Sequence, residues 1–168
     1  MRDDIEAVLD QMAEKLRSRL PDDAAIIGIY TGGVWVAEAL QRRLDLETEA
    51  GQVDISFYRD DFTRIGLHPQ VRASHIPFDV DNRHILLVDD VLHTGRTIRA
   101  ALNEIFDYGR PAQITLAVLV DRDGRELPIQ ADVVGMYQPL QSGEQIKLTG
   151  PEPLRLEIRQ QQGADSPA

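Results

Sequence analysis

Cysteine is absent from the 168 residues of this chain, and its absence removes several kinds of chemistry. Disulfide bonds, zinc sites built from thiolates and catalysis by a thiol are all excluded. Long apolar runs are missing too, because none approaches the ~18 residues of a membrane-spanning helix. With no signal-like N-terminus either, we expect a soluble cytoplasmic protein that does not bind membranes.

Positive charge is also scarce. Lysine and arginine number 18 against 28 aspartates and glutamates, which gives a net charge of −10. Because nucleic-acid binding usually needs a basic face, this balance disfavours RNA or DNA as a partner. A basic patch would require the fold to gather a few local clusters, each of which is more typical of a solvated face. These clusters are Lys15 with Arg17 and Arg19, Arg42 with Arg43, and Arg122 with Arg125.

The apolar residues that are present alternate between helical and strand spacing, which predicts an α/β domain with a mainly parallel sheet. At this length we expect one domain over residues 1–160, followed by a disordered tail over 161–168. The predicted helices cover about 5–20, 36–44 and 98–106, and the predicted strands cover 25–30, 53–57, 85–88, 114–120, 133–137 and, weakly, 154–158.

Residues 85–99 are the most informative part of the sequence. The apolar run Ile85 to Val88 predicts a strand buried on both faces, and two carboxylates, Asp89 and Asp90, follow it directly. Thr-Gly-Arg-Thr at 94–97 comes next, and then apolar residues at helical spacing. The order is strand, acidic turn, polar loop and helix N-terminus, which is where open α/β sheets bind ligands.

Each residue type in this stretch suits a different part of one ligand. A helix N-terminus binds phosphate, Gly95 permits a close approach, and the hydroxyls of Thr94 and Thr97 donate hydrogen bonds or cap the helix. Asp89 and Asp90 repel phosphate, so we expect them to face either sugar hydroxyls or a hydrated Mg²⁺. A ligand with a phosphate, a diol and a metal-bound anion, such as 5-phosphoribosyl-1-pyrophosphate (PRPP), fits this arrangement.

Residues 85–99 resemble the PRPP loop of the type I phosphoribosyltransferases. Three further motifs, at 54–61, 107–111 and 118–129, resemble the PyrR family of pyrimidine-operon regulators and uracil phosphoribosyltransferases. The resemblance spans about residues 25–147. It implies a type I phosphoribosyltransferase fold, in which helices flank a central, mainly parallel sheet, with a small hood and a flexible active-site loop. It also implies transfer of a phosphoribosyl group to uracil, which gives UMP and pyrophosphate and requires Mg²⁺.

The same resemblance assigns the site residues. The catalytic candidates are Asp89, Asp90 and Arg59, and the PRPP-binding residues are Asp89, Asp90, Val91, Leu92, His93, Thr94, Gly95, Arg96 and Thr97. Thr31, Gly32 and Gly33 form the pyrophosphate loop, Asp60, Asp61 and Arg64 belong to the flexible loop, and backbone groups near Val133 and Val134 contact the base. No protein ligand of the metal is assigned directly; Mg²⁺ arrives with PRPP, and Asp89 and Asp90 are the candidates to contact it.

Simpler interpretations remain open for several of these residues. Arg59 is alternatively a surface cation paired with Asp60 or Asp61, and Arg96 alternatively points to solvent. The stretch 31–33 is alternatively a plain turn between a strand and a helix, and the stretch 60–78 a surface excursion.

Two positions depart from the family pattern. Gly32 stands where relatives often carry an arginine, so one cationic contact to pyrophosphate is missing. His93 stands where purine-specific relatives commonly carry an aspartate, which argues against a purine substrate.

The resemblance also implies a second function, UMP-dependent binding to the leader of pyrimidine-operon messenger RNA. The charge balance places this function after catalysis. A third interpretation is a nucleotide sensor with weak or no catalysis. Relatives assemble, so we expect a homo-oligomer, either a dimer or a tetramer.

Overall fold

The computed structural model describes residues 4–55 and 74–160, and its centre is a five-stranded parallel sheet. The strands are β1 (Ala25–Ile29), β2 (Gly51–Val53), β3 (His84–Leu92), β4 (Gln113–Asp121) and β5 (Val133–Tyr137). They lie in the order β2-β1-β3-β4-β5, and every neighbouring pair is parallel. The predicted α/β fold is confirmed.

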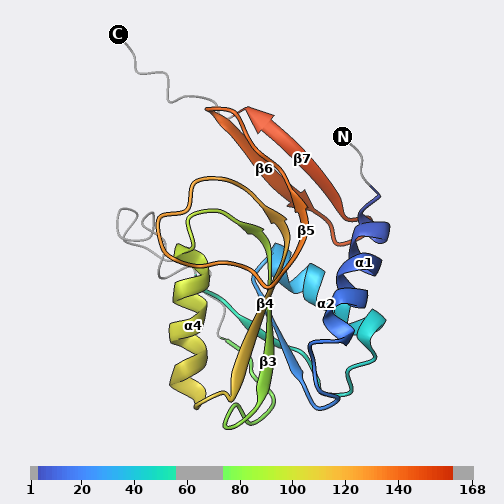
Figure 1. Ribbon diagram of the computed structural model, residues 1–168, viewed down its shortest axis with the longest axis vertical. Coiled ribbons are helices and arrows are strands. Elements are labelled where there is room, and N and C mark those ends of the chain that lie inside the picture. Colours follow the sequence, from blue (N-terminus) through green and yellow to red (C-terminus); the bar gives the residue numbers. More distant parts are fainter. Residues whose placement is uncertain (1–3, 56–73, 161–168) are drawn as a thin grey trace.

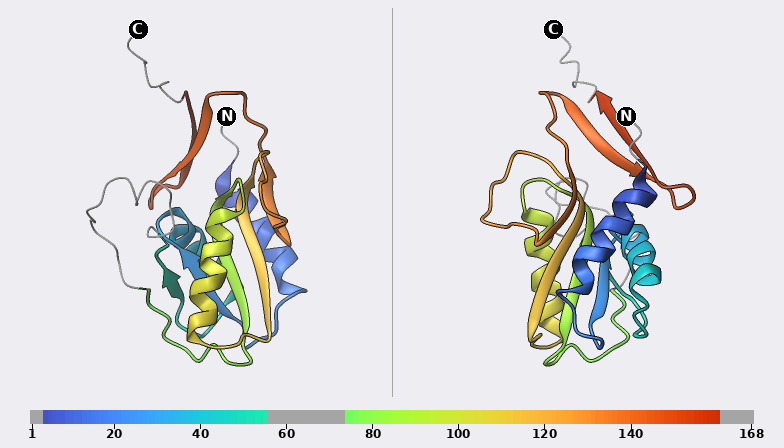
Figure 2. Two further views of the ribbon diagram at one scale, coloured as in Figure 1. Left: turned by 90° about the vertical axis from the view of Figure 1, so that its left-hand side faces the viewer. Right: turned by 45° about the vertical axis from the view of Figure 1, so that its right-hand side comes forward.

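Helices cover both faces of this sheet. They are α1 (Ile5–Arg17), α2 (Gly32–Leu44) and α4 (Arg96–Tyr108). Helices α1 and α2 pack on one face and α4 on the other (Figures 1 and 2). Strand β3 serves both layers, because Leu86 and Val88 join the core under α1 and α2 while Ile85 and Leu87 join the core under α4. This alternation explains why the strand is apolar without interruption in the sequence.

Local sequence sets the helix ends. The side chain of Asp4 caps α1, since it accepts hydrogen bonds from the backbone amides of Glu6 at 3.0 Å and Ala7 at 3.4 Å. Helix α1 ends at Arg17, three residues before the predicted end. Helix α4 ends at Tyr108, two residues after the predicted end, and Gly109 is its C-cap.

Two strand predictions need correction. The strand expected at 53–57 is β2, which begins at Gly51 and ends at Val53. The strand expected to end at Val88 continues to Leu92, so Asp89 and Asp90 lie within β3 and not in a turn. The cause is β4, which pairs with β3 as far as Leu92 and keeps the acidic residues extended.

A second, separate sheet forms a small hood. It consists of β6 (Glu144–Thr149) and β7 (Arg155–Gln160), which are antiparallel. The sequence predicted β7 only weakly and β6 not at all, because β6 is mostly polar. Its apolar residues Ile146 and Leu148, with Leu154 and Leu156, pack onto the core under α1 and α2. Figure 1 shows the hood beyond one end of the main sheet.

Among residues 4–55 and 74–160, no helix is long and apolar enough to cross a membrane.

Candidate active site

The strand order brings two loops together at the centre of the sheet. The chain leaves β1 towards β2 on one side, and it leaves β3 towards β4 on the other. Between two neighbouring strands whose connections diverge, an open α/β sheet has a crevice at its carboxyl ends. The residues after β1, Thr31–Gly33, and the acidic end of β3 therefore lie side by side. The sequence predicted both segments as parts of one site.

Glycine at 32 and 33 permits this close approach. A Cβ on Gly33 would lie 2.7 Å from the backbone oxygen of Val88, and a Cβ on Gly32 would lie 2.7 Å from Cγ of Asp90. Both distances are too short for any other residue without a shift. Gly32 and Gly33 are also the first residues of α2, with Thr31 at its N-cap, so the segment has the positive end of a helix dipole.

The two carboxylates stand at different depths. Asp89 is 5% exposed and its Oδ1 accepts a hydrogen bond from the amide of Asp90 at 2.8 Å. Asp90 is half-buried, and its Oδ1 accepts from the amide of Val91 at 2.8 Å. Its other oxygen contacts the position where Gly32 would carry a side chain. Asp90 therefore bridges the end of β3 and the start of α2.

The start of α4 is built as an anion site. Gly95, at φ 95°, is the N-cap and has no side chain with which to cap the helix, so first-turn amides other than that of Arg96 are available to a ligand. The prediction that Thr94 or Thr97 caps α4 is wrong. Thr94 instead accepts a hydrogen bond from the amide of Arg96 at 3.1 Å, and Thr97 lies in the first turn.

The stretch after β4 supports this loop from behind. Backbone amides of Arg122 and Glu126 donate to the backbone oxygens of Leu92 and Thr94 at 3.1 and 2.9 Å. The Arg96 side chain also turns to this stretch, where its Nε donates to Glu126 at 3.0 Å. Arg96 therefore does not reach towards a phosphate in this arrangement.

A cavity of about 550 Å³ opens beside the loop. Val91 and His93 of β3 and its loop line one wall, and Arg122 at the end of β4 lines another. Residues 140–146, which lead into the hood, complete it. The Nε of Arg122 is buried and has no hydrogen-bond partner among the described residues. A buried donor without a hydrogen-bond partner is energetically costly.

His93 is neutral in this setting. Burial lowers the pKa of His93 below its ordinary value, and the nearby Arg122 guanidinium lowers it further. Glu126 opposes this effect, and Arg125 adds to it. The imidazole ring of His93, which lines the cavity, is consequently uncharged near pH 7.

Val133 and Val134, near which base contacts are predicted, lie in strand β5. Val133 is 2% exposed in the core under α1 and α2, and Val134 packs against the core under α4. Both pair with the middle of β4, and neither lines the cavity. The cavity is lined instead by residues that include Arg122 and 140–146, and among these only Arg122 falls within a motif that the sequence analysis singled out. The contact of Val133 and Val134 with the base stays a prediction.

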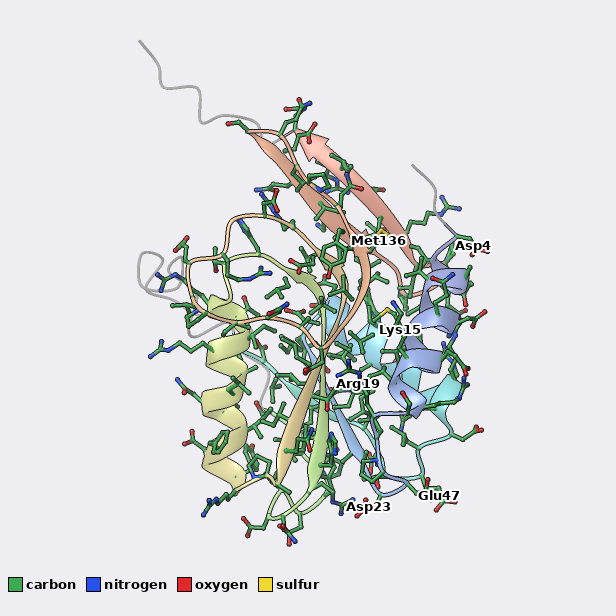
Figure 3. All side chains as sticks on the ribbon, viewed as in Figure 1. Asp4, Lys15, Arg19, Asp23, Glu47 and Met136 are labelled. Carbon is green, nitrogen blue, oxygen red and sulfur yellow. The ribbon has the colours of Figure 1, made fainter. Side chains whose placement is uncertain are left out.

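Arg59, Asp60, Asp61 and Arg64 lie outside the described residues, so the structure places none of them. Within residues 4–55 and 74–160, no group of three or more histidines and acidic residues is arranged to hold a metal ion. A larger cavity of about 920 Å³ lies between α1, β5 and β7, and it contains none of the predicted site residues. Asp4 and Met136, labelled in Figure 3, are among the residues that line it.

Comparison with known proteins places this site in a family. Residues 2–150 match the family described as "Phosphoribosyl transferase domain". A protein of Nitrosococcus oceani named "Bifunctional protein PyrR" is 59% identical over 161 residues, which cover 92% of this chain and 91% of that protein. A Pseudomonas aeruginosa protein of the same name is 56% identical over 154 residues, which cover 89% of this chain and 91% of that protein.

Solved structures agree on the fold. A hypoxanthine-guanine phosphoribosyltransferase of Bacillus anthracis superposes with a TM-score of 0.68 at 15% identity, covering 82% of each chain. A hypoxanthine-guanine-xanthine phosphoribosyltransferase superposes with a TM-score of 0.62 at 23% identity, covering 82% of this chain and 75% of that one. At such low identity the likeness concerns the fold alone.

Proposed function

Because this chain belongs to the PyrR family and carries a phosphoribosyl transferase domain, we propose that it transfers the phosphoribosyl group of PRPP to uracil. The products are UMP and pyrophosphate. The observation that carries the proposal is the meeting of three parts: the glycine segment at 31–33, the acidic end of β3 and the uncapped start of α4. Each part suits a different portion of PRPP.

The proposed placement of PRPP follows from charge. The 5′-phosphate lies at the start of α4, where amides and the hydroxyls of Thr94 and Thr97 donate hydrogen bonds. The ribose hydroxyls donate to Asp89 and Asp90. The pyrophosphate lies on the amides of Gly32 and Gly33 at the start of α2. In this placement Asp89 and Asp90 lie between the site for the 5′-phosphate and the site for pyrophosphate, and neither carboxylate contacts a phosphate.

Uracil occupies the 550 Å³ cavity beside the loop. Its ring carries two carbonyl oxygens, and Arg122, which lines the cavity, carries guanidinium donors suited to such acceptors. Val91 and the neutral ring of His93 provide the flat, uncharged contacts that a nucleobase needs. A histidine, rather than the aspartate that purine-specific relatives commonly carry, is consistent with this choice of base.

The chemistry is displacement at C1 of the ribose: the bond from C1 to a nitrogen of uracil forms, the bond from C1 to the pyrophosphate oxygen breaks, and the proton of that nitrogen is released to solvent. The transition state has cationic character at the ring, so catalysis consists of positioning and electrostatics. Asp89 and Asp90 lie where their charge stabilises that centre. Their carboxylates also fit a hydrated Mg²⁺ that accompanies PRPP and, when bound, neutralises the pyrophosphate. We propose Arg59 as a further cation for the leaving group.

The experiment that tests this function is release of pyrophosphate from PRPP and Mg²⁺ with uracil, orotate, hypoxanthine or adenine, each added separately. Release with uracil alone supports the proposal. Release with a purine base instead would assign a different substrate. No release with any base, from a protein that still binds UMP, would make the nucleotide sensor the better interpretation.

Regulation through pyrimidine-operon messenger RNA is the second candidate, and it is favoured by the name of the relatives, which are bifunctional. We rank it after catalysis because, in each candidate basic cluster, at least one arginine is paired with a carboxylate. Arg17 pairs with Glu14, Arg43 with Glu6 and Asp10, and Arg125 with Asp121. Sub-micromolar, salt-dependent binding of a leader hairpin, tested with and without UMP, would reverse the ranking.

A further inference from the structure

Three successive carbonyl groups of the PRPP loop are held by the stretch that follows β4. The backbone oxygen of Leu92 accepts from the amide of Arg122, and that of Thr94 accepts from the amides of Glu126 and Leu127. The oxygen between them, that of His93, accepts from a side chain, the Nη1 of Arg125, at 2.6 Å. The loop backbone is therefore fixed on one side by consecutive contacts.

This arrangement decides where the loop amides point. In a trans peptide unit, the N–H and the C=O point in opposite directions. Holding the oxygens of residues 92–94 against the stretch 122–127 consequently turns the amides of residues 93–95 away from it. These amides belong to the loop in which we place the 5′-phosphate. The contacts behind the loop thus orient the donors in front of it.

Arg125 links this loop to the sheet. Its second nitrogen, Nη2, donates to Oδ1 of Asp121 at 2.9 Å, and Asp121 is the last residue of β4 and only 9% exposed. The pair is well buried, with side chains 27% and 11% exposed for Arg125 and Asp121. Next to it, Gly124 has φ 115°, and a Cβ there would lie 2.7 Å from Nε2 of His93. The stretch is shaped to fit against the loop.

We infer that Arg125 is a positioning residue for PRPP binding. It fixes the peptide between His93 and Thr94 by joining its carbonyl to the carboxylate of Asp121, and it does not itself contact substrate. A planar guanidinium bonds two acceptors at once, whereas the single ammonium of lysine does so in a less defined geometry. The inference rests on the proposed function, because it assumes that the loop binds a phosphate of PRPP.

Substitution of Arg125, measured on the full chain, tests the inference. Arg125→Gln should raise KM for PRPP about tenfold or more and leave KM for uracil within about threefold. Arg125→Lys should lie between Arg125→Gln and the wild-type protein, because it keeps the charge. Equal KM values for PRPP in Arg125→Gln and the wild type would overturn the inference, as would a rise in both KM values by the same factor.

Arg43→Gln is the matched control. Arg43 also joins a carboxylate and a backbone oxygen, since its Nε donates to Asp10 at 2.7 Å and its Nη1 to Ala39 at 3.0 Å, but it lies between α1 and α2. Its replacement should lower Tm and leave KM for PRPP unchanged. If Arg125→Gln does not fold, Arg125→Lys decides the question, and a KM for PRPP equal to that of the wild type would contradict the proposed role.

Calorimetric binding of PRPP in the absence of any base separates the two proposals. If the wild-type protein releases no pyrophosphate with any base, the proposed function fails. The effect of Arg125 on PRPP affinity remains measurable in that case. Weaker binding by Arg125→Gln supports the inference, and equal binding overturns it.

Discussion

The two ends of the parallel sheet use the same residue types for different purposes. At the amino end, polar groups satisfy one another: Arg83 donates to the backbone oxygen of Asp23, and Asp81 accepts from the amide of Arg110 at 2.8 Å. Figure 3 marks this end by Asp23 and Glu47. At the carboxyl end, carboxylates approach glycines, and a buried arginine nitrogen has no hydrogen-bond partner within the part of the chain that the structure describes. Whether a charged residue has a structural or a functional role is therefore indicated by its partners and not by its type.

A pair of histidines shows the same contrast. Burial lowers the pKa of both His84 and His93. At the amino end, His84 shares a hydrogen bond of 2.8 Å with Thr115, and the carboxylates of Asp23 and Asp132 oppose the effect of burial. At the carboxyl end, Arg122 and Arg125 reinforce the effect of burial on His93 while Glu126 opposes it, and His93 lines a cavity.

The largest expected effect comes from the acidic residues. Asp89→Asn and Asp90→Asn should each lower kcat/KM by about 10²–10³-fold, because each removes charge beside the cationic transition state. At the amino end, Asp81→Asn should lower the free energy of unfolding by about 1 kcal/mol and leave kcat/KM unchanged. Steady-state kinetics and thermal melts of the three variants check this. Unfolding of both site variants would mean that the acidic pair is structural.

Next in size is the effect of a side chain at position 32. In Gly32→Ala, the new Cβ would clash with the Asp90 carboxyl group and force it to rotate. Misplacement of a positioned group by about 1 Å lowers activity by up to about 10²-fold, so we expect a loss of about tenfold or more in kcat/KM.

Gly51→Ala is the control for this variant. Its Cβ would lie 3.2 Å from the backbone oxygen of His75, at the edge strand β2, and would displace no site residue. It should affect Tm alone. Full activity of Gly32→Ala would show that Asp90 moves freely and that its position beside Gly32 does not matter.

A smaller effect should separate the base from PRPP. Arg122→Gln should raise KM for uracil by about tenfold, because a charged hydrogen bond contributes about 1.5–3 kcal/mol, and it should change KM for PRPP little. Arg83→Gln, which removes an arginine contact at the amino end, should leave both KM values unchanged. If replacing Arg122 raised KM for PRPP and not KM for uracil, the proposal that uracil binds in this cavity would be wrong.

The smallest effect concerns pH. The fold lowers the pKa of His93 and His84. As the pH falls below the histidine pKa of the unfolded state, about 6.5, these two side chains therefore bind more protons in the unfolded state than in the folded state. Both groups therefore favour the folded state above about pH 6.5, and this contribution is lost as pH falls. When the pH is lowered from 7.5 to 5, the difference in Tm between each variant, His93→Asn or His84→Asn, and the wild type should change in favour of the variant. Only His93→Asn should alter KM for uracil, and an effect from His84→Asn would contradict the contrast between the two ends.

Local patterns made much of this predictable. Uninterrupted apolar runs predicted the buried strands, and the bounds of β5 at 133–137 agree with the prediction. The approximate start of α4 was predictable because glycine and threonine stand next to one another directly before apolar residues at helical spacing. Strand β6 was missed because most of its residues are polar, so its sequence cannot be distinguished from that of a loop.

Other parts of the site have no local pattern. Gly32 and Asp90 meet only because β1 and β3 are neighbours in the sheet. The cavity proposed for the base takes Val91 and His93 from the end of β3, Arg122 from the end of β4 and a stretch that leads into the hood, so no spacing within the sequence reveals it. Such sites follow from topology rather than from sequence spacing.

The hood has a consequence for how this protein can diversify. One wall of the base cavity belongs to the main sheet and its loops, and another comes from residues 140–146 at the entrance to a separately paired sheet. Under the proposed placement of uracil, mutations in the hood should alter which base is accepted without disturbing the strands of the main sheet. The proposed site thus separates a fixed chemical centre from a recognition surface that can change independently in evolution.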